Sequence, residues 1–186
     1  MAVRPILKLG NADLLKISVP VADPTAPEIR DLVQDMRDTL DDVSGIGLAA
    51  PQIGRPLRIV LYCLPPHRIP QGAKAKPIPW TAMINPVIET IGDEKRPMWE
   101  RCLSLPGLYA KVPRFNRIVI RYSTLEGTEV EESWRGYVAM LLQHECDHLD
   151  GILYPARMAS PMDMAYASEV TADGRVVAYD PAEFDG

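Results

Sequence analysis

The segment QHECDHLDG at positions 143–151 constrains this chain more than any other. It carries an HExxH pattern inside an apolar run that we expect to be helical. His144 and His148 are four residues apart, so on a helix both imidazoles lie on one face and can bind a single metal ion. Glu145 lies about 100° around the helix, where a carboxylate that transfers protons is needed. The pattern predicts a mononuclear metal hydrolase.

Size and composition indicate an ordinary globular protein. The 186 residues suit a single domain over 1–186, with 47% hydrophobic and 24% charged residues. The net charge of −5 predicts no stable nucleic-acid binding, and no apolar run reaches the roughly 18 residues that span a membrane. Three cysteines and a start unlike a secretory signal favour the cytoplasm. We expect the last dozen residues to be loosely held, and the sequence indicates no oligomeric state.

Helical spacing of apolar residues marks two long helices. The first is predicted from Ala26 to Val43, with Thr25 and Glu28 as a capping box and Ser44-Gly45 at its end. The second, Trp134 to Leu149, carries the HExxH pattern. It is apolar on most sides, so we expect a buried, central helix.

The remaining patterns predict strands and one long loop. Five prolines between Pro65 and Trp80 indicate an exposed loop. Strands are predicted at Arg58–Cys63, Ala82–Ile91 and Leu108–Val112, and as a hairpin of Arg117–Ser123 with Thr128–Glu132. Strands that precede one core helix, rather than alternating with helices, favour an α+β fold of antiparallel sheets around that helix.

Two histidines do not complete a catalytic metal site, which needs a third protein ligand and one open position. No histidine follows His148, and the downstream acids, such as Asp163 and Glu169, have no recognisable ligand spacing. Cys102 lies upstream, although a buried and inert role is the usual one for a single cysteine. We expect that inert role for Cys63 and Cys146 and a solvated surface position for His67, the third histidine.

The segment GIGLAA at positions 45–50 superficially matches a dinucleotide-binding fingerprint. That fingerprint must follow a strand and open a helix, whereas here a helix precedes it and Pro51 discourages one afterwards. We therefore expect a tight glycine loop that lets a substrate approach the backbone, with the amide of Gln52 at its end.

Three segments together, GIGLAAPQ at 45–52, ERCLS at 100–104 and QHECDH at 143–148, resemble the peptide deformylase family in order and spacing. The resemblance extends from Leu14 to about Met158. The long loop at 65–80 and the residues Pro106-Gly107-Leu108 are more similar to the organellar-like branch of the family than to its shorter bacterial members.

This resemblance implies a peptide deformylase-like fold and a hydrolase of protein biosynthesis that removes the formyl group from the N-terminal formylmethionine of nascent peptides. It implies one Fe²⁺ ion, replaceable by Zn²⁺, Ni²⁺ or Co²⁺, with Cys102, His144 and His148 as ligands. The metal would activate the water that attacks the formyl carbon, while Glu145 moves its proton. Ribosome contact follows as an expectation from the substrate alone.

The resemblance also implies residues that contact the substrate. Gln52 and the backbone N–H of Leu103 would stabilise the oxyanion. The backbones of Ile46 and Gly47 would pair with an extended peptide, as in strand addition. The expected methionine pocket comprises Tyr137, Met140 and Leu141.

One position departs from the family pattern, which has glycine where this chain has Arg101. An arginine could crowd the peptide, and a positive φ would strain it, so we expect retained metal binding with weakened or altered activity. Glu100 and Arg114 could orient a ligand or could be solvated charges.

Two other functions are compatible with the motif. One is an HExxH metallopeptidase. The other is a deformylase-like protein that keeps the metal as a structural clamp or binds peptides in its groove; the presence of both Glu145 and Gln52 argues against it, since a structural site needs neither residue.

Overall fold

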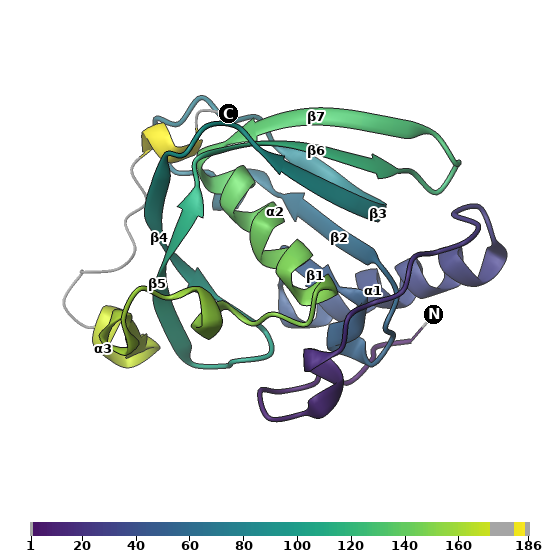
Figure 1. Cartoon of the computed structure of the whole chain (residues 1–186), viewed down its shortest axis with the longest axis horizontal. Helices are drawn as coiled ribbons and strands as arrows, with labels where there is room; N and C mark the ends of the chain where they lie inside the picture. Colours follow the sequence, from purple (N-terminus) through teal and green to yellow (C-terminus); the bar gives the residue numbers. More distant parts are fainter. Residues whose placement is uncertain (1, 172–180, 185–186) are drawn as a thin grey trace.

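The structure, a computed structural model, describes residues 2–171 and 181–184. Its two long helices are α1 (Pro27–Val43) and α2 (Gly136–Leu149), and a short third helix, α3, covers Ala167–Thr171. In Figure 1, α2 lies in the middle of the molecule, with β6 and β7 above it and β4 and β5 to its left. None of the helices in the described ranges is long and apolar enough to cross a membrane.

The larger sheet has five antiparallel strands in the order β1-β2-β3-β6-β7. Its strands are β1 (Gly47–Ala49), β2 (Ile59–Leu64), β3 (Ile78–Thr90), β6 (Arg117–Ser123) and β7 (Glu129–Arg135). The smaller sheet is also antiparallel, in the order β4-β5-β8. It comprises β4 (Lys95–Arg101), β5 (Leu108–Phe115) and β8 (Met164–Tyr166).

Strand β2 explains how the two helices are placed. All six of its residues are buried, and successive side chains of a strand point to opposite faces. Ile59 and Leu61 pack in the same core cluster as α1, whereas Val60 and Tyr62 pack with the apolar residues of α2. The two helices therefore cover opposite faces of the larger sheet.

Helix α2 is the centre of the fold, as its apolar sequence predicts. Every one of its residues is buried, and it contacts β1, β2, β3, β6 and β7 of one sheet and β5 of the other. Gln143 ties it to β5: its amide oxygen accepts a hydrogen bond from Phe115 N at 3.1 Å, and its amide nitrogen donates to Phe115 O at 2.8 Å. These two hydrogen bonds hold the part of α2 that carries the HExxH motif against the smaller sheet.

The α+β architecture and the central helix are confirmed, while several local predictions are wrong. Ala26, not Thr25, caps α1, and no side-chain hydrogen bond caps this end. The glycine loop continues into a strand, β1, and the proline-rich stretch ends in β3. Strands β4 and β8 were not predicted.

The start of α2 is also later than predicted. Trp134 and Arg135 belong to β7, and the chain turns at Gly136, whose φ of 59° favours glycine. Of the tail expected to be loose, residues 181–184 form a turn of 3₁₀-helix that contacts α2, with Phe184 buried. Its other members, 175–180 and 185–186, lie outside the described residues.

Candidate metal centre

Helix α2 presents His144 and His148 from one face, as the i, i+4 spacing predicts. Their ring centroids are 5.0 Å apart, and the two rings are almost perpendicular, at 81°. His144 is 6% exposed and His148 is 1% exposed. Both imidazoles are thus held in the protein interior by the packing of α2.

Cys102 joins the two histidines from the end of the neighbouring strand β4. Its sulfur lies 3.3 Å from His148 Nε2, and one ligand atom from each of the three residues falls within 4.8 Å of the others. Two hydrogen bonds position the sulfur, from the Gln52 amide and from Ser104 N, each at 3.4 Å. The structure therefore brings together residues that are more than forty positions apart.

The three side chains fit a divalent metal ion by their chemistry. A thiolate and two imidazoles are ligands of Zn²⁺ and similar ions, and a set of three leaves a position open. His148 Nδ1 and Glu145 Oε2 are buried and have no hydrogen-bond partner among the described residues. Orphaned polar atoms are costly in a protein interior, so their presence here indicates a functional site.

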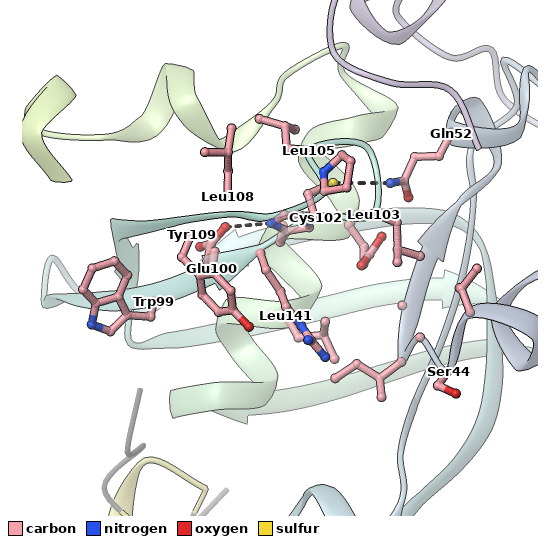
Figure 2. A pocket seen from close by; sticks show the side chains of 18 of the residues that line it. Ser44, Gln52, Trp99, Glu100, Cys102, Leu103, Leu105, Leu108, Tyr109 and Leu141 are labelled. Carbon is pink, nitrogen blue, oxygen red and sulfur yellow. Dashed lines mark hydrogen bonds and ion pairs between the residues drawn. The ribbon is translucent and has the colours of Figure 1, made fainter. Parts of the chain in front are cut away.

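A network of buried charges lies beside the three candidate ligands (Figure 2 shows Glu100, on β4, close to Cys102, which directly follows this strand). Glu100 Oε2 lies 2.7 Å from His144 Nδ1, and Arg114 donates two hydrogen bonds to the same carboxylate, at 2.6 and 3.0 Å. Arg114 also donates to Asp147 on α2 at 2.5 Å, and Asp147 accepts from Arg157 as well. The alternative of solvated charges is wrong for Glu100 and Arg114, which are 3% and 4% exposed.

This network decides which nitrogen of His144 can bind a metal. A carboxylate only accepts hydrogen bonds, so Nδ1 carries a proton that it donates to Glu100, and Nε2 is the nitrogen left for a ligand role once it gives up its own proton. A carboxylate behind a histidine ligand is a common feature of metal sites, where it fixes the ring and raises its basicity.

Cys102 and Glu100 both favour a positive charge on the His144 ring. Burial opposes charge on His144, but hydrogen bonds and attraction from these two residues raise its pKa well above the usual value. Burial, followed by repulsion from His144 and Arg114, lowers the pKa of His148 well below the usual value. His148 is therefore neutral, which is the form that binds metals.

Glu145 lies beside the three ligands and faces β1. Burial raises the pKa of its carboxyl group to about 7. Its side chain fits against Gly47, where a Cβ atom would overlap the carboxylate. A carboxyl group that gains and loses a proton near neutral pH is suited to general acid–base chemistry.

A cavity of about 670 Å³ opens onto this centre (Figure 2). Its lining includes two of the three candidate ligands, Cys102 and His144, while the third, His148, is almost wholly buried. The remaining residues that the family resemblance assigns to catalysis or substrate binding also line it: Ile46, Gly47, Gln52, Leu103, Tyr137, Met140, Leu141 and Glu145.

Gln52 is held so that its amide nitrogen faces the centre. Its side-chain oxygen accepts a hydrogen bond from Ala49 N at 2.9 Å, and its nitrogen donates to Ser104 Oγ at 3.1 Å. Gln52 lies in a 3₁₀-helix, Ala50–Ile53, and is 1% exposed. This arrangement places an N–H donor beside the Cys102 sulfur.

Arg101 and His67, two exposed residues, also line the cavity. Arg101 is exposed, lies in β4 opposite Tyr109 and lines the cavity. Only Ser44 and Asn85 have a positive φ among the described non-glycine residues, so Arg101 has no left-handed strain. His67 is exposed, as expected, yet it also lines the cavity.

Two residues at the site escaped prediction. Asp147 lies inside the motif, but the HExxH pattern assigns it no role; it is 8% exposed and accepts a hydrogen bond from Arg114, a partner distant in sequence. Phe184 lines the cavity and stacks on Tyr137, with ring centroids 4.2 Å apart. A single aromatic residue in an acidic tail carries no local signal of such a contact.

The family model and the relatives that match this chain are all peptide deformylases. Residues 3–163 match the family model described as "Polypeptide deformylase". The chain is 43% identical over 185 residues to peptide deformylase 1 of Prochlorococcus marinus, covering 98% of this chain and 95% of the relative. It is 43% identical to peptide deformylase 2 of Ralstonia nicotianae, covering 84% of this chain and 87% of the relative.

Solved structures of similar proteins share the fold. One is a Met-Ala-Ser-bound class I type b peptide deformylase from Acinetobacter baumannii, with a TM-score of 0.77, 32% identity, and coverage of 84% of this chain and 99% of that one. Another is a peptide deformylase from Thermotoga maritima, with a TM-score of 0.74, 32% identity, and coverage of 86% and 100%.

Proposed function

The chain belongs to the polypeptide deformylase family, and we propose which of its residues carry out the reaction of this family. The enzyme is a metal-dependent hydrolase that removes the formyl group from the N-terminal methionine of new polypeptides. The observation that carries the assignment is the convergence of Cys102, His144 and His148, beside Glu145, on a cavity large enough for a peptide end.

Cys102, His144 and His148 hold the metal ion. Fe²⁺ is the proposed ion, and Zn²⁺, Ni²⁺ or Co²⁺ can replace it, since thiolate and imidazole ligands accept several divalent ions. When bound, the ion supplies Lewis acidity: it polarises a carbonyl group and lowers the pKa of water toward about 7. Glu100 acts behind the ligands as a positioning residue, because its carboxylate fixes the His144 ring.

Glu145 is the general base and then the general acid. It accepts the proton of the attacking water and delivers a proton to the amine that leaves when the formyl C–N bond breaks. Its pKa of about 7 suits both transfers. The carboxylate lies so close to Gly47 that a Cβ atom there would overlap it, and both residues line the cavity.

Gln52 and the backbone N–H of Leu103 stabilise the negative charge that develops on the formyl oxygen. The hydrogen bond from Ala49 N fixes the Gln52 amide, so the donor is oriented before substrate arrives. A preorganised donor of this kind typically contributes about 10²–10³ in turnover.

The peptide adds to the free edge of β1. This strand is at the edge of the larger sheet, and Ile46 and Gly47 line the cavity at its start. Backbone pairing there would extend the sheet by one strand. The methionine side chain then enters the apolar pocket of Tyr137, Met140 and Leu141, along the turns of α2 that precede His144.

Arg101 adjusts peptide binding rather than preventing activity. Its side chain is exposed and its backbone is extended, which supports a role at the cavity mouth. We expect Arg101→Gly to change KM for formylated peptides while metal content stays the same. A variant that loses metal, or one whose KM for formylated peptides is unchanged, would contradict this role.

The proposed substrate also indicates the partners and the cellular location of the enzyme. N-formylmethionyl nascent peptides are its partners, which places it in the cytoplasm with transient ribosome contact, without stable nucleic-acid or membrane binding. One domain over 1–186 is proposed, supported by the contacts of α2 with both sheets.

A formate-release assay tests the function. Protein purified anaerobically and analysed for metal should release formate from formyl-Met-Ala-Ser and should not cleave the unformylated peptide. Glu145→Ala should keep its metal and lose turnover by at least about 10². Internal cleavage of the unformylated peptide would indicate a metallopeptidase instead, and unchanged turnover in Glu145→Ala would refute the role of this residue.

A further inference from the structure

We infer that Phe184, near the C-terminal end of the chain, closes the far end of the methionine pocket and limits the length of the side chain that the enzyme accepts. This inference rests on the proposed function, because it assigns a specificity-determining residue to that same pocket. Phe184 is 2% exposed and lines the cavity that contains Cys102 and His144.

The position of Phe184 follows from its contact with Tyr137. The two rings are stacked at 17° with centroids 4.2 Å apart, a geometry in which aromatic side chains bury large apolar areas. Residues 181–184 form a turn of 3₁₀-helix that packs on α2. Phe184 also belongs to the apolar cluster that contains Met140 and Leu141.

The geometry of α2 places this stack two helical turns away from the metal centre, along the same helix. Tyr137 is seven residues before His144, which is about 10 Å along the helix axis at a rise of 1.5 Å per residue. Met140 and Leu141 lie between them, one turn before His144. The pocket therefore extends along α2 from the reacting end, beside His144, to the Tyr137–Phe184 stack.

An aromatic wall at that distance discriminates by length. A side chain that fits between the centre and the stack gains apolar contact, while a longer one must displace the Phe184 ring or leave the reacting group out of place. One methylene in a hydrophobic pocket typically changes kcat/KM about 10-fold or more. Removal of the Phe184 ring should therefore extend the pocket toward longer side chains.

A series of formylated X-Ala-Ser peptides tests this, with X as methionine, norleucine or the longer 2-aminooctanoic acid. The measured quantity is the ratio of kcat/KM for 2-aminooctanoic acid to that for norleucine. Phe184→Ala should raise this ratio at least tenfold, and Phe184→Leu should raise it less. Met162→Ala is the matched control, because Met162 is 88% exposed and does not line the cavity; it should leave the ratio unchanged.

Binding of the deformylated peptides, measured by calorimetry, gives a second readout that needs no turnover. Phe184→Ala should strengthen binding of the 2-aminooctanoyl peptide relative to Met-Ala-Ser. If Phe184→Ala does not unfold cooperatively in urea, Phe184→Leu decides the question. An unchanged ratio and unchanged relative binding in a folded variant would overturn the inference.

Failure of the proposed function would look different. In that case the wild-type protein would release no formate from formyl-Met-Ala-Ser, whatever residue occupies position 184. The binding measurement would then still support or overturn the role of Phe184 as a wall.

Discussion

Arg114→Met tests whether the buried charges behind the metal centre act as one unit. Methionine keeps most of the apolar stem and removes the guanidinium group. Arg114 donates two hydrogen bonds to Glu100 and one to Asp147, and all three side chains are buried. The substitution leaves two carboxylates in the interior without their shared cation.

The expected loss of stability is large for that reason. Removing one partner of a buried ion pair typically costs about 3–5 kcal/mol. Because Arg157 still pairs with Asp147 and His144 with Glu100, we expect a loss of about 3 kcal/mol, at the lower end of this range. A second effect should fall on the metal. Glu100 would lose the partner that orients its carboxylate behind His144, and losing such support typically lowers metal affinity about 10–100-fold.

Arg121→Met is a matched control. Arg121 also pairs with two carboxylates, Glu89 and Glu131, but its side chain is 51% exposed. Exposed ion pairs contribute little because water solvates both charges, so this variant should leave stability and metal affinity almost unchanged.

Urea unfolding of chelator-treated protein measures the first effect without a contribution from bound metal. Competition with a chromophoric chelator, using Zn²⁺ as the probe, measures the second. Similar results for Arg114→Met and Arg121→Met in both assays would refute the reasoning, because burial would then have no influence on the contribution of the charge.

Three further substitutions test other parts of the structure. Gly47→Ala should lower kcat/KM at least tenfold without loss of metal, because the new methyl group overlaps the Glu145 carboxylate; normal activity would contradict that contact. Gly151→Ala should lower the free energy of unfolding by at least about 1 kcal/mol, since Gly151 has a φ of 70°; urea unfolding will show whether it does. The hydrogen bond from Arg4 lowers the pKa of Asp35, so Asp35 stabilises the fold above its unfolded pKa of about 3.9. Asp35→Asn should therefore be less stable than wild type at pH 7, and the difference should disappear as the pH falls through the folded pKa; a difference that grows in acid would contradict this.

The parts of the site that were predictable are those that depend on local spacing. His144 and His148 share a face because four residues make about one helical turn, and no other part of the chain is needed for that. Cys102 was different, since its residue type and position are equally compatible with an inert core cysteine. Family resemblance, rather than spacing, identified it as a ligand.

The parts that could not be predicted depend on contacts distant in sequence. Strand β4 contains Pro97 and several charges, which gives it little intrinsic strand signal, yet it forms by pairing along its length with β5. The burial of Arg114 follows from partners on β4 and α2 together. Phe184 likewise becomes part of a cavity wall only because α2 offers it the Tyr137 ring.

X-ray absorption spectroscopy of the Zn²⁺-loaded protein tests the central assignment most directly, because it identifies the atoms bound to the ion. We expect one sulfur at about 2.3 Å and two nitrogens at about 2.0–2.1 Å, with the sulfur lost in Cys102→Ser. A wild-type spectrum with nitrogen and oxygen neighbours only, or one that Cys102→Ser does not change, would contradict the account.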